Sequence, residues 1–352
     1  MDQKFPLALS YDDVLLVPQY SEIKSRSEIA LSIQLTPKAK LSIPLLSSNM
    51  SDVTGLDMAI ALGNLGGLGV IPRFMLVEKE ADIVNKIKKH KLLAAAAVGC
   101  KQGEMERAEA LVKAGVDLLF LDVANGHMLQ AIETTVFLKQ KFGKYVDVVS
   151  GNVATKQGAE ALFKAGADCV KVGIGAGTAC ITRIQTGAGV PQITATLDCA
   201  NAARKYKRSI ICDAGTKNSG DIVKGLAAGA SAVMAGSQFA GHDESPGSLV
   251  IKDGKKFKTY NGSASFAEKN KHTKVLDGLS KEYTSHVEGV ESLVPYKGPV
   301  KKSVDSWIAG IRSGFSYCGS KDIYTLWKNA KFIRVSSMGL KENGSHDVIL
   351  AR

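Results

Sequence analysis

Residues 165–175 read Ala165-Gly-Ala-Asp-Cys-Val-Lys-Val-Gly-Ile-Gly175, a helix end followed by a glycine and then an apolar strand. The same junction recurs, because Ala114-Gly-Val-Asp117 and Ala228-Gly-Ala-Ser231 also end helical patterns and lead directly into strands. Glycine suits the position after the last helical turn, where the chain reverses. The sequence therefore predicts a repeated helix–strand unit.

Short apolar runs extend this unit over the first two-thirds of the chain. Most neighbouring runs are separated by a segment with helical periodicity, such as 56–65, 104–113, 157–164 and 220–227. This alternation is typical of parallel βα units, and eight such units predict an α/β fold of the TIM (β/α)8 barrel type. The predicted strands are 43–50, 68–73, 92–99, 118–124, 146–153, 169–175, 209–215 and 232–239.

The pattern changes after residue 239. Residues 241–300 are polar, rich in Lys, Ser and Gly, and poor in strand signal. Segments that follow barrel strands build active sites, so we expect a mobile flap here; a surface insertion without a role is the alternative. Helical patterns at 304–311 and 323–331 and a strand at 332–335 are expected to cover the barrel, so that residues 1–352 form a single catalytic domain.

The charge balance favours an anionic partner. There are 45 Lys and Arg against 34 Asp and Glu, a formal net charge of +11. Phosphorylated metabolites, nucleic acid and membrane surfaces all fit such a charge. The lysines are mostly scattered and aromatic residues make up only 6%, so a base-stacking nucleic-acid surface is not expected.

The cysteines and the N-terminal residues indicate a cytoplasmic protein. Six cysteines occur without a CxxC pair, which favours reduced thiols and argues against a zinc site. The first residues lack the apolar stretch of a signal peptide, and no run reaches the roughly 18 apolar residues of a membrane helix. No membrane association is therefore expected.

A glycine-rich segment after the sixth strand holds a candidate nucleophile. Gly173, Gly175 and Gly177 alternate there, and such a loop can approach a phosphate or an ion with its backbone groups. Cys180 follows among small and hydroxyl residues, where backbone amides and Arg183 would favour a nucleophilic thiolate. The alternative is an inert packing cysteine.

The seventh and eighth strands end in small residues, at the place where barrels frequently bind phosphate. These ends read Ile211-Cys-Asp213-Ala-Gly215 and Val233-Met-Ala-Gly236-Ser237. Asp213 can accept hydrogen bonds from ribose hydroxyls, or it can serve as a helix cap or turn residue. Both strand ends are therefore candidate parts of a nucleotide site.

These segments, with the opening Tyr11-Asp-Asp-Val-Leu-Leu-Val-Pro18, resemble the IMP dehydrogenase/GMP reductase family over nearly the whole chain. The resemblance implies a TIM barrel, a homotetramer, and a cysteine that attacks C2 of a purine nucleotide monophosphate. A nicotinamide cofactor would exchange hydride with that carbon. Many family members insert a regulatory CBS pair after the second strand, but here Arg73-Phe-Met runs into a helix and leaves no room for it.

The resemblance also implies roles for individual residues. Cys180 would form the covalent purine intermediate, and Thr182 would help to activate water or ammonia. Glu288 would be the partner of Thr182 in proton transfer. The other implied positions are substrate contacts at Thr178, Asp213, Gly215, Gly236, Ser237 and Tyr260, cofactor contacts at Asp122, Val123, Ala124 and Asn152, and potassium-binding carbonyls at Gly175, Gly177 and Cys180.

The flap separates the two chemistries of the family. IMP dehydrogenases carry an Arg-Tyr pair there, whose arginine helps to activate water, whereas residues 261–287 contain no arginine. The resemblance therefore implies a GMP reductase that converts GMP and NADPH into IMP and ammonia. The alternative is an IMP dehydrogenase that oxidises IMP to XMP with NAD. Segments resembling GMP reductase are 24–28, 48–50, 121–126, 241–245 and 282–283.

Some segments depart from this pattern. Residues 66–71, 294–299 and 346–348 resemble IMP dehydrogenase, and residues 261–264 lack the methionine that normally lies near the base. Ala214 replaces the first glycine after Asp213, and no arginine stands immediately before Glu288. His286 could serve the flap in place of that arginine. These departures affect base recognition most.

Two rival classes follow from the residues themselves. A flavin-dependent barrel oxidoreductase would also place phosphate at Gly215 and Gly236. A non-catalytic nucleotide or nucleic-acid binder would explain the net charge of +11, but it would leave Cys180, Thr182 and Glu288 without a purpose.

Overall fold

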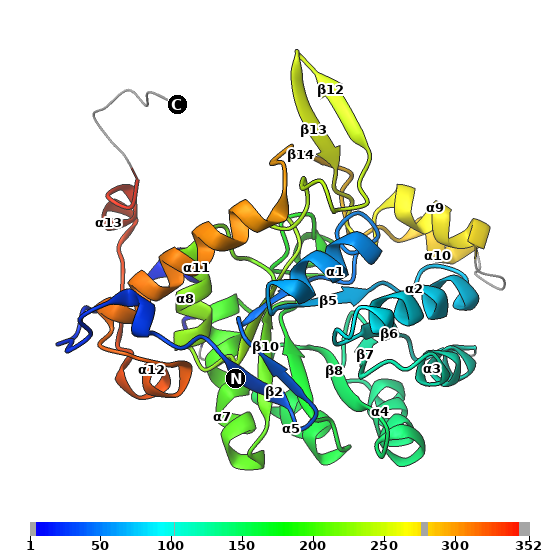
Figure 1. The fold of residues 1–352 in the computed structure, drawn as a ribbon, viewed down its shortest axis with the longest axis horizontal. Coiled ribbons are helices and arrows are strands. Elements are labelled where there is room, and N and C mark those ends of the chain that lie inside the picture. Colours follow the sequence, from blue (N-terminus) through cyan, green and yellow to red (C-terminus); the bar gives the residue numbers. More distant parts are fainter. Residues whose placement is uncertain (1–4, 102, 276–280, 345–352) are drawn as a thin grey trace.

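A closed barrel of eight parallel strands forms the centre of the molecule (Figure 1). The computed structural model describes residues 5–101, 103–275 and 281–344. Every barrel strand lies inside a predicted apolar run, which confirms the TIM barrel. In the order of their pairing, the strands are β4 (Leu45–Ser47), β5 (Leu68–Ile71), β6 (Ala95–Val98), β7 (Leu118–Asp122), β8 (Asp147–Val153), β9 (Cys169–Val172), β10 (Ser209–Asp213) and β11 (Ala232–Ala235).

Helices cover the outside of the barrel, one after each strand (Figure 1). The last of them is separated from its strand, because residues 236–299 lie between β11 and α11. We count α11 as the eighth barrel helix because it packs between α8 and α1, the helices that follow β10 and β4 on either side of β11. The barrel helices are α1 (Leu56–Asn64), α2 (Val77–Lys89), α3 (Glu104–Lys113), α4 (Leu129–Phe142), α5 (Lys156–Lys164), α7 (Gln192–Tyr206), α8 (Ser219–Ala227) and α11 (Val300–Tyr317).

The repeated helix–strand junction has one geometry. Gly115, Gly166 and Gly229 have positive φ values of 89°, 100° and 106°, as expected for glycine just after a helix. Asp117 lies two residues beyond Gly115. Its carboxylate accepts hydrogen bonds from the Lys88 ammonium at 2.7 Å and from the amide of Ala94, directly before β6, at 2.8 Å. The junction at Asp117 therefore also places a carboxylate that joins neighbouring units.

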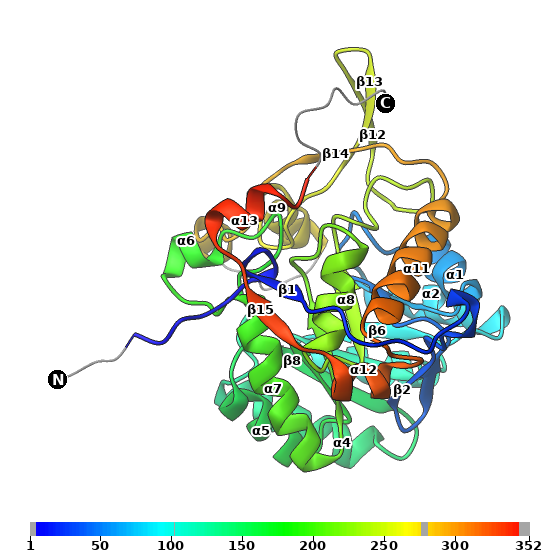
Figure 2. The same ribbon diagram turned by 90° about the vertical axis from the view of Figure 1, so that its left-hand side faces the viewer.

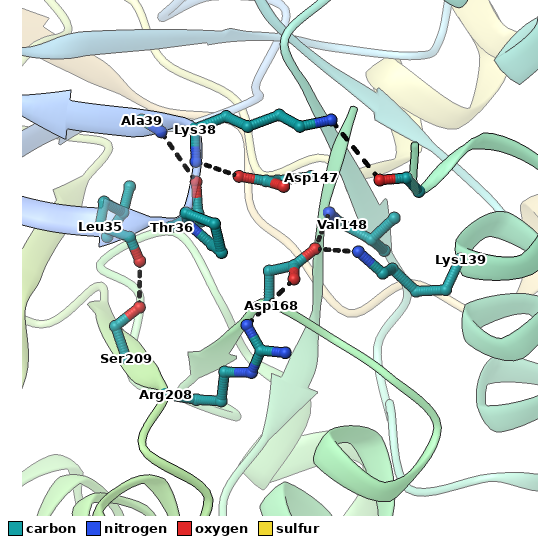
Figure 3. Close-up of polar contacts among 12 residues, drawn as sticks. Leu35, Thr36, Lys38, Ala39, Lys139, Asp147, Val148, Asp168, Arg208 and Ser209 are labelled. Carbon is teal, nitrogen blue, oxygen red and sulfur yellow. Dashed lines mark hydrogen bonds and ion pairs between the residues drawn. The ribbon is translucent and has the colours of Figure 1, made fainter. Parts of the chain in front are cut away.

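Asp168 repeats this arrangement at the bottom of the barrel (Figure 3). Its buried carboxylate accepts hydrogen bonds from Lys139 Nζ at 2.6 Å and from the Val148 amide at 2.9 Å, and Arg208 Nη1 lies 3.2 Å away. Two cations and an amide thus neutralise and satisfy one buried carboxylate, as buried charges require.

A hairpin closes the same end of the barrel (Figure 3). The Lys38 amide at its turn donates to the Asp147 carboxylate at 2.7 Å, and Ser209 donates to the Leu35 carbonyl. Because Asp147 and Ser209 begin their strands, the hairpin lies against the amino ends, opposite the end where barrel enzymes bind ligands. Its strands are β2 (Ile33–Thr36) and β3 (Ala39–Leu41).

The segment between β11 and α11 is more ordered than its sequence suggests. It contains a three-stranded antiparallel sheet, whose first hairpin forms an arm projecting from the barrel (Figure 1). The expectation of little strand structure in 241–300 was therefore wrong. The elements are β12 (Leu249–Lys252), β13 (Lys255–Thr259), α9 (Phe266–Val275), α10 (Lys281–Ser285) and β14 (Leu293–Pro295).

A strand near each end of the described chain contributes to a small two-stranded sheet (Figure 2). The predicted strand at 332–335 appears as β15, which pairs antiparallel with β1. The predicted terminal helices are confirmed as parts of α11 and as α12. No helix among the described residues is long and apolar enough to cross a membrane. The remaining elements are η1 (Tyr11–Asp13), β1 (Val14–Leu16), η2 (Arg26–Glu28), α6 (Thr182–Thr186), α12 (Ile323–Asn329), β15 (Phe332–Arg334) and α13 (Ser337–Lys341).

Candidate active site

A cavity of about 400 Å³ lies at the carboxyl ends of the barrel strands and under the segment 260–289. A smaller recess adjoins it and shares Gly177, Ala214, Gly236 and Tyr260 with it. Every residue assigned to the site from sequence lines one of the two. The cavity brings together Asp122, Val123, Ala124, Asn152, Gly175, Gly177, Cys180, Thr182, Asp213, Gly236, Tyr260 and Glu288, and the recess adds Thr178, Gly215 and Ser237.

Cys180 sits in a tight turn beyond β9. Its amide donates to the Gly177 carbonyl at 3.0 Å, and its Sγ lies 3.1 Å from Thr182 Oγ1. The thiol is partly buried and faces the cavity, which favours the reactive interpretation over the inert one. Arg183 does not serve it as expected, because that guanidinium donates to the Ile174 and Val190 carbonyls instead.

A strand-like contact brings Glu288 to this turn. The Ile181 amide donates to the Glu288 carbonyl at 2.9 Å, and the Val290 amide donates to the Ala179 carbonyl at 3.0 Å. These bonds place the carboxylate so that Thr182 Oγ1 donates to Oε2 at 2.6 Å. The flap residue and the cysteine loop thus form one unit, although 106 positions separate Thr182 and Glu288 in sequence.

The charge on Glu288 is stabilised locally. The hydrogen bond from Thr182 lowers the pKa of the Glu288 carboxyl, partial burial opposes this, and the adjacent His286 lowers the pKa further. His286 Nε2 lies 2.8 Å from Glu288 Oε1. The carboxylate is therefore ionised over a wider pH range than an ordinary glutamate and accepts hydrogen bonds from both sides.

The floor of the cavity contains a buried lysine that sequence reasoning missed. Lys171 Nζ lies 2.7 Å from the Asp213 carboxylate and 3.7 Å from that of Asp122. Burial disfavours its charge, but the two carboxylates outweigh this and raise its pKa. The available signal was a single lysine inside the apolar strand β9.

Asp213 is fixed by this lysine and by Asn152, whose Nδ2 donates to Oδ2 at 2.8 Å. Among the described residues no donor reaches Oδ1, so that oxygen is left to accept from a ligand. The helix-cap alternative for Asp213 is wrong, because Asn218 caps α8. Asn152 Oδ1 is also buried, and no partner for it occurs in the described part of the chain.

The small recess is lined by hydroxyl groups and glycine backbone. Thr178 Oγ1 and Ser237 Oγ lie 3.2 Å apart, and a side chain on Gly236 would come within 2.6 Å of the Tyr260 hydroxyl. Gly215 has a φ of 86°, in the left-handed region. Such a concave set of backbone and hydroxyl groups suits a phosphate.

Aromatic rings form the wall beside Asp122. Arg73 lies 3.8 Å from the Asp122 carboxylate and over the Phe74 ring at 4.1 Å. Phe74 stacks on His272 of α9 with ring centres 3.7 Å apart, and His272 Nδ1 is 2.8 Å from the Tyr283 hydroxyl. Burial, with help from nearby cations, lowers the pKa of His272 to about 3, so this contact between flap and barrel is uncharged. Sequence reasoning gave none of these three rings a role in this wall.

The fold and this cavity together define a barrel enzyme built around a cysteine, a hydroxyl and a carboxylate. The chain belongs to the IMP dehydrogenase/GMP reductase family, whose sequence model matches residues 8–346. Family members are purine nucleotide oxidoreductases that bind a purine nucleotide monophosphate and use a nicotinamide cofactor. This membership removes the flavin-dependent and non-catalytic alternatives.

Relatives of both activities match nearly the full chain. An inosine-5'-monophosphate dehydrogenase of Nitrosopumilus maritimus is 35% identical, covering 99% of this chain and 100% of the relative. A GMP reductase of Leishmania donovani is 30% identical, with 97% of each chain covered. The solved structure of Trypanosoma brucei GMP reductase C318A with guanosine 5'-monophosphate is 30% identical, covers 98% of this chain and 99% of that one, and gives a TM-score of 0.92.

The connection after β5 agrees with the absence of an inserted CBS pair. Residues 72–76 alone join β5 to α2. The alignment with the Nitrosopumilus enzyme spans 476 positions, whereas this chain has 352 residues, so that relative carries residues that are missing here.

Proposed function

We propose that this chain is a GMP reductase, which converts GMP and NADPH into IMP, ammonia and NADP. The observation that carries the proposal is the flap: Glu288 reaches the cysteine loop through Thr182, while residues 261–287 contain no arginine to activate water. The flap side chains that line the cavity near Glu288 include Lys269 and Tyr283. The likeness to a GMP reductase solved with GMP supports the proposal.

Cys180 is the nucleophile in this proposal. Its thiolate adds to C2 of the purine, and the amine leaves from that carbon with a proton delivered through Thr182, whose Oγ1 lies 3.1 Å from the sulfur. Glu288 holds the hydroxyl in place. Asp213 Oδ1 would accept from the ribose, and Thr178 and Ser237 would bind the phosphate in the recess.

The residues present fit the nicotinamide cofactor. Asn152 lines the cavity, and its buried Oδ1 has no hydrogen-bond partner among the described residues. This oxygen could therefore accept a hydrogen bond from a bound ligand. Asp122, Val123 and Ala124 would hold the cofactor beside it. When bound, NADPH would supply the hydride that C2 takes up after the amine has left, and the C2–S bond would then break to release IMP and the Cys180 thiolate.

The cysteine turn fits a potassium ion. Its candidate ligands are the carbonyls of Gly175, Gly177 and Cys180, and carbonyl oxygens are the ligands that K⁺ accepts in proteins. Gly175 has a φ of 73°, which lets the loop fold tightly around such a site. The ion would rigidify the turn that carries the nucleophile.

The alternative reaction is the oxidation of IMP to XMP with NAD. It is favoured by the higher identity to a relative named as an IMP dehydrogenase, 35% against 30% for the GMP reductase. Absorbance at the reduced-nicotinamide band tests both in potassium buffer. Consumption of NADPH with GMP, with IMP and ammonia formed, supports the proposal, and NADH formation from IMP and NAD with XMP as product overturns it.

We further propose a homotetramer in the cytoplasm. Exposed Leu249 and Ile251 on the projecting hairpin support contact between copies of the chain. Sedimentation of the purified protein checks the assembly.

A further inference from the structure

The Glu288 carboxylate makes contacts in two opposite directions. Oε2 accepts from Thr182 inside the cavity at 2.6 Å, and Oε1 lies 2.8 Å from His286 Nε2. The Glu288 side chain is 19% exposed and that of His286 is 56% exposed. A continuous hydrogen-bonded row therefore leads from Cys180 through Thr182 and Glu288 to an imidazole in contact with solvent.

The backbone on both sides keeps this row in place. The Glu288 carbonyl accepts from the Ile181 amide, and the Lys269 ammonium of α9 donates to the His286 carbonyl. Within the described ranges, the charged groups in printed contact with His286 are Glu288, through the imidazole, and Lys269 of α9, through the backbone carbonyl. Lys269 Nζ also lies 4.8 Å from the centre of the Tyr283 ring of α10, so α9, α10 and the segment with His286 meet at this lysine.

The proposed reaction needs protons from outside the cavity. When the C2–N bond breaks, the electron pair leaves with nitrogen, and the amine must take up a proton; one more yields ammonium. GMP, NADPH and two protons thus become IMP, NADP and ammonium. Thr182 exchanges only the proton it holds. Because its hydrogen bonds lower the pKa of Glu288, that carboxylate does not store a proton at neutral pH either.

We propose that His286 is a proton-relay residue, which passes protons from solvent through Glu288 and Thr182 to the departing amine. This inference rests on the proposed reductase activity. The imidazole acts through Glu288 and so positions and supplies protons without touching the purine. Histidine suits this task because its protonation changes near neutral pH.

The test compares the unmodified protein with His286→Gln and His286→Ala in GMP-dependent oxidation of NADPH from pH 6 to 9. Glutamine can still donate a hydrogen bond to Glu288 but cannot transfer a proton to it. His90→Gln, at an exposed helix end, is the matched control. We expect kcat about 10-fold lower in both His286 variants, with KM for GMP within about twofold. This loss is smaller than the roughly 100-fold or more of a direct proton donor, because His286 acts through Glu288. Added imidazole should raise the rate of His286→Ala to at least half of the rate of the unmodified protein.

The pH profile separates a relay from a structural role. Because the reductive direction takes up protons that the relay supplies, the rate of the unmodified protein should fall with rising pH, and the two His286 variants should show a weaker decline. An unchanged kcat in His286→Gln, or a loss with the same pH profile and no rescue, overturns the relay.

A second readout does not depend on turnover. The ¹⁵N shifts of the His286 ring should change between the unmodified protein and Glu288→Gln, and equal shifts overturn the pairing. An unmodified protein without GMP-dependent NADPH oxidation overturns the proposed function instead, so the two failures are distinguishable.

Discussion

Replacing Lys171 with methionine should damage both stability and catalysis. The change leaves the Asp213 and Asp122 carboxylates, at 2.7 and 3.7 Å, without their shared cation. Breaking a buried ion pair by removing one partner costs about 3–5 kcal/mol. Asp213 keeps its bond from Asn152, which places the expected loss near the lower end, at about 3 kcal/mol.

The same loss should appear in kinetics, because Asp213 and Asp122 are the proposed contacts of substrate and cofactor. About 3 kcal/mol corresponds to roughly a 100-fold drop in kcat/KM for GMP. Urea unfolding followed by fluorescence measures the first effect, and NADPH consumption at limiting GMP measures the second. Lys171→Arg keeps the charge and serves if the methionine variant does not fold.

Lys139→Met is the matched control at the other end of the barrel. Lys139 pairs with Asp168 at 2.6 Å, but Arg208 still neutralises that carboxylate and the lysine is partly exposed. We expect a loss of about 1 kcal/mol and unchanged kinetics. The reasoning is refuted if Lys171→Met unfolds within about 1 kcal/mol of the unmodified protein and keeps its kcat/KM.

Three further outcomes are expected. Glu288→Gln should slow GMP deamination about 100-fold or more, measured as ammonia release, and unchanged release would contradict the assigned role. Ala214 has a φ of 74°, so Ala214→Gly should stabilise the fold by about 0.5–1 kcal/mol in urea unfolding, while Ala165→Gly, at a φ of −70°, should destabilise it. Thr182→Val removes the hydrogen bond that lowers the pKa of Glu288, so the pKa of the Glu288 carboxyl, measured by ¹³C NMR, should rise. As pH falls, the variant should then lose the Glu288 charge at a higher pH than the unmodified protein does.

The barrel could be predicted because each unit carries its own local signals. The apolar runs predicted all eight strands. The Ala-Gly junctions at Gly115, Gly166 and Gly229 predicted where the chain reverses between a helix and the next strand. The projecting hairpin was missed because its strands are short and lysine-rich. Its turn, however, is Asp253-Gly254 with φ values of 51° and 70°, a combination typical of a two-residue hairpin loop.

The site was predictable where the chemistry lies in one segment. The glycine-rich loop indicated Cys180 as a candidate nucleophile, whereas the role of Thr182 was implied by the family resemblance. Contacts between distant segments do not follow from local patterns: only the family resemblance linked Thr182 with Glu288, and nothing near Lys171 in sequence indicates that it neutralises two carboxylates at other strand ends. The stacking of Phe74 on His272 likewise arises only when the flap packs on the barrel.

The pairing of β1 with β15 joins a segment near the start of the chain to one near its far end. Immediately before β1, the buried Tyr11 hydroxyl lies 2.9 Å from Cys212 Sγ, next to Asp213. During synthesis β1 can meet its partner strand only after residue 334 has left the ribosome. A chain released before that point would leave β1 unpaired three residues from the Tyr11 that contacts Cys212.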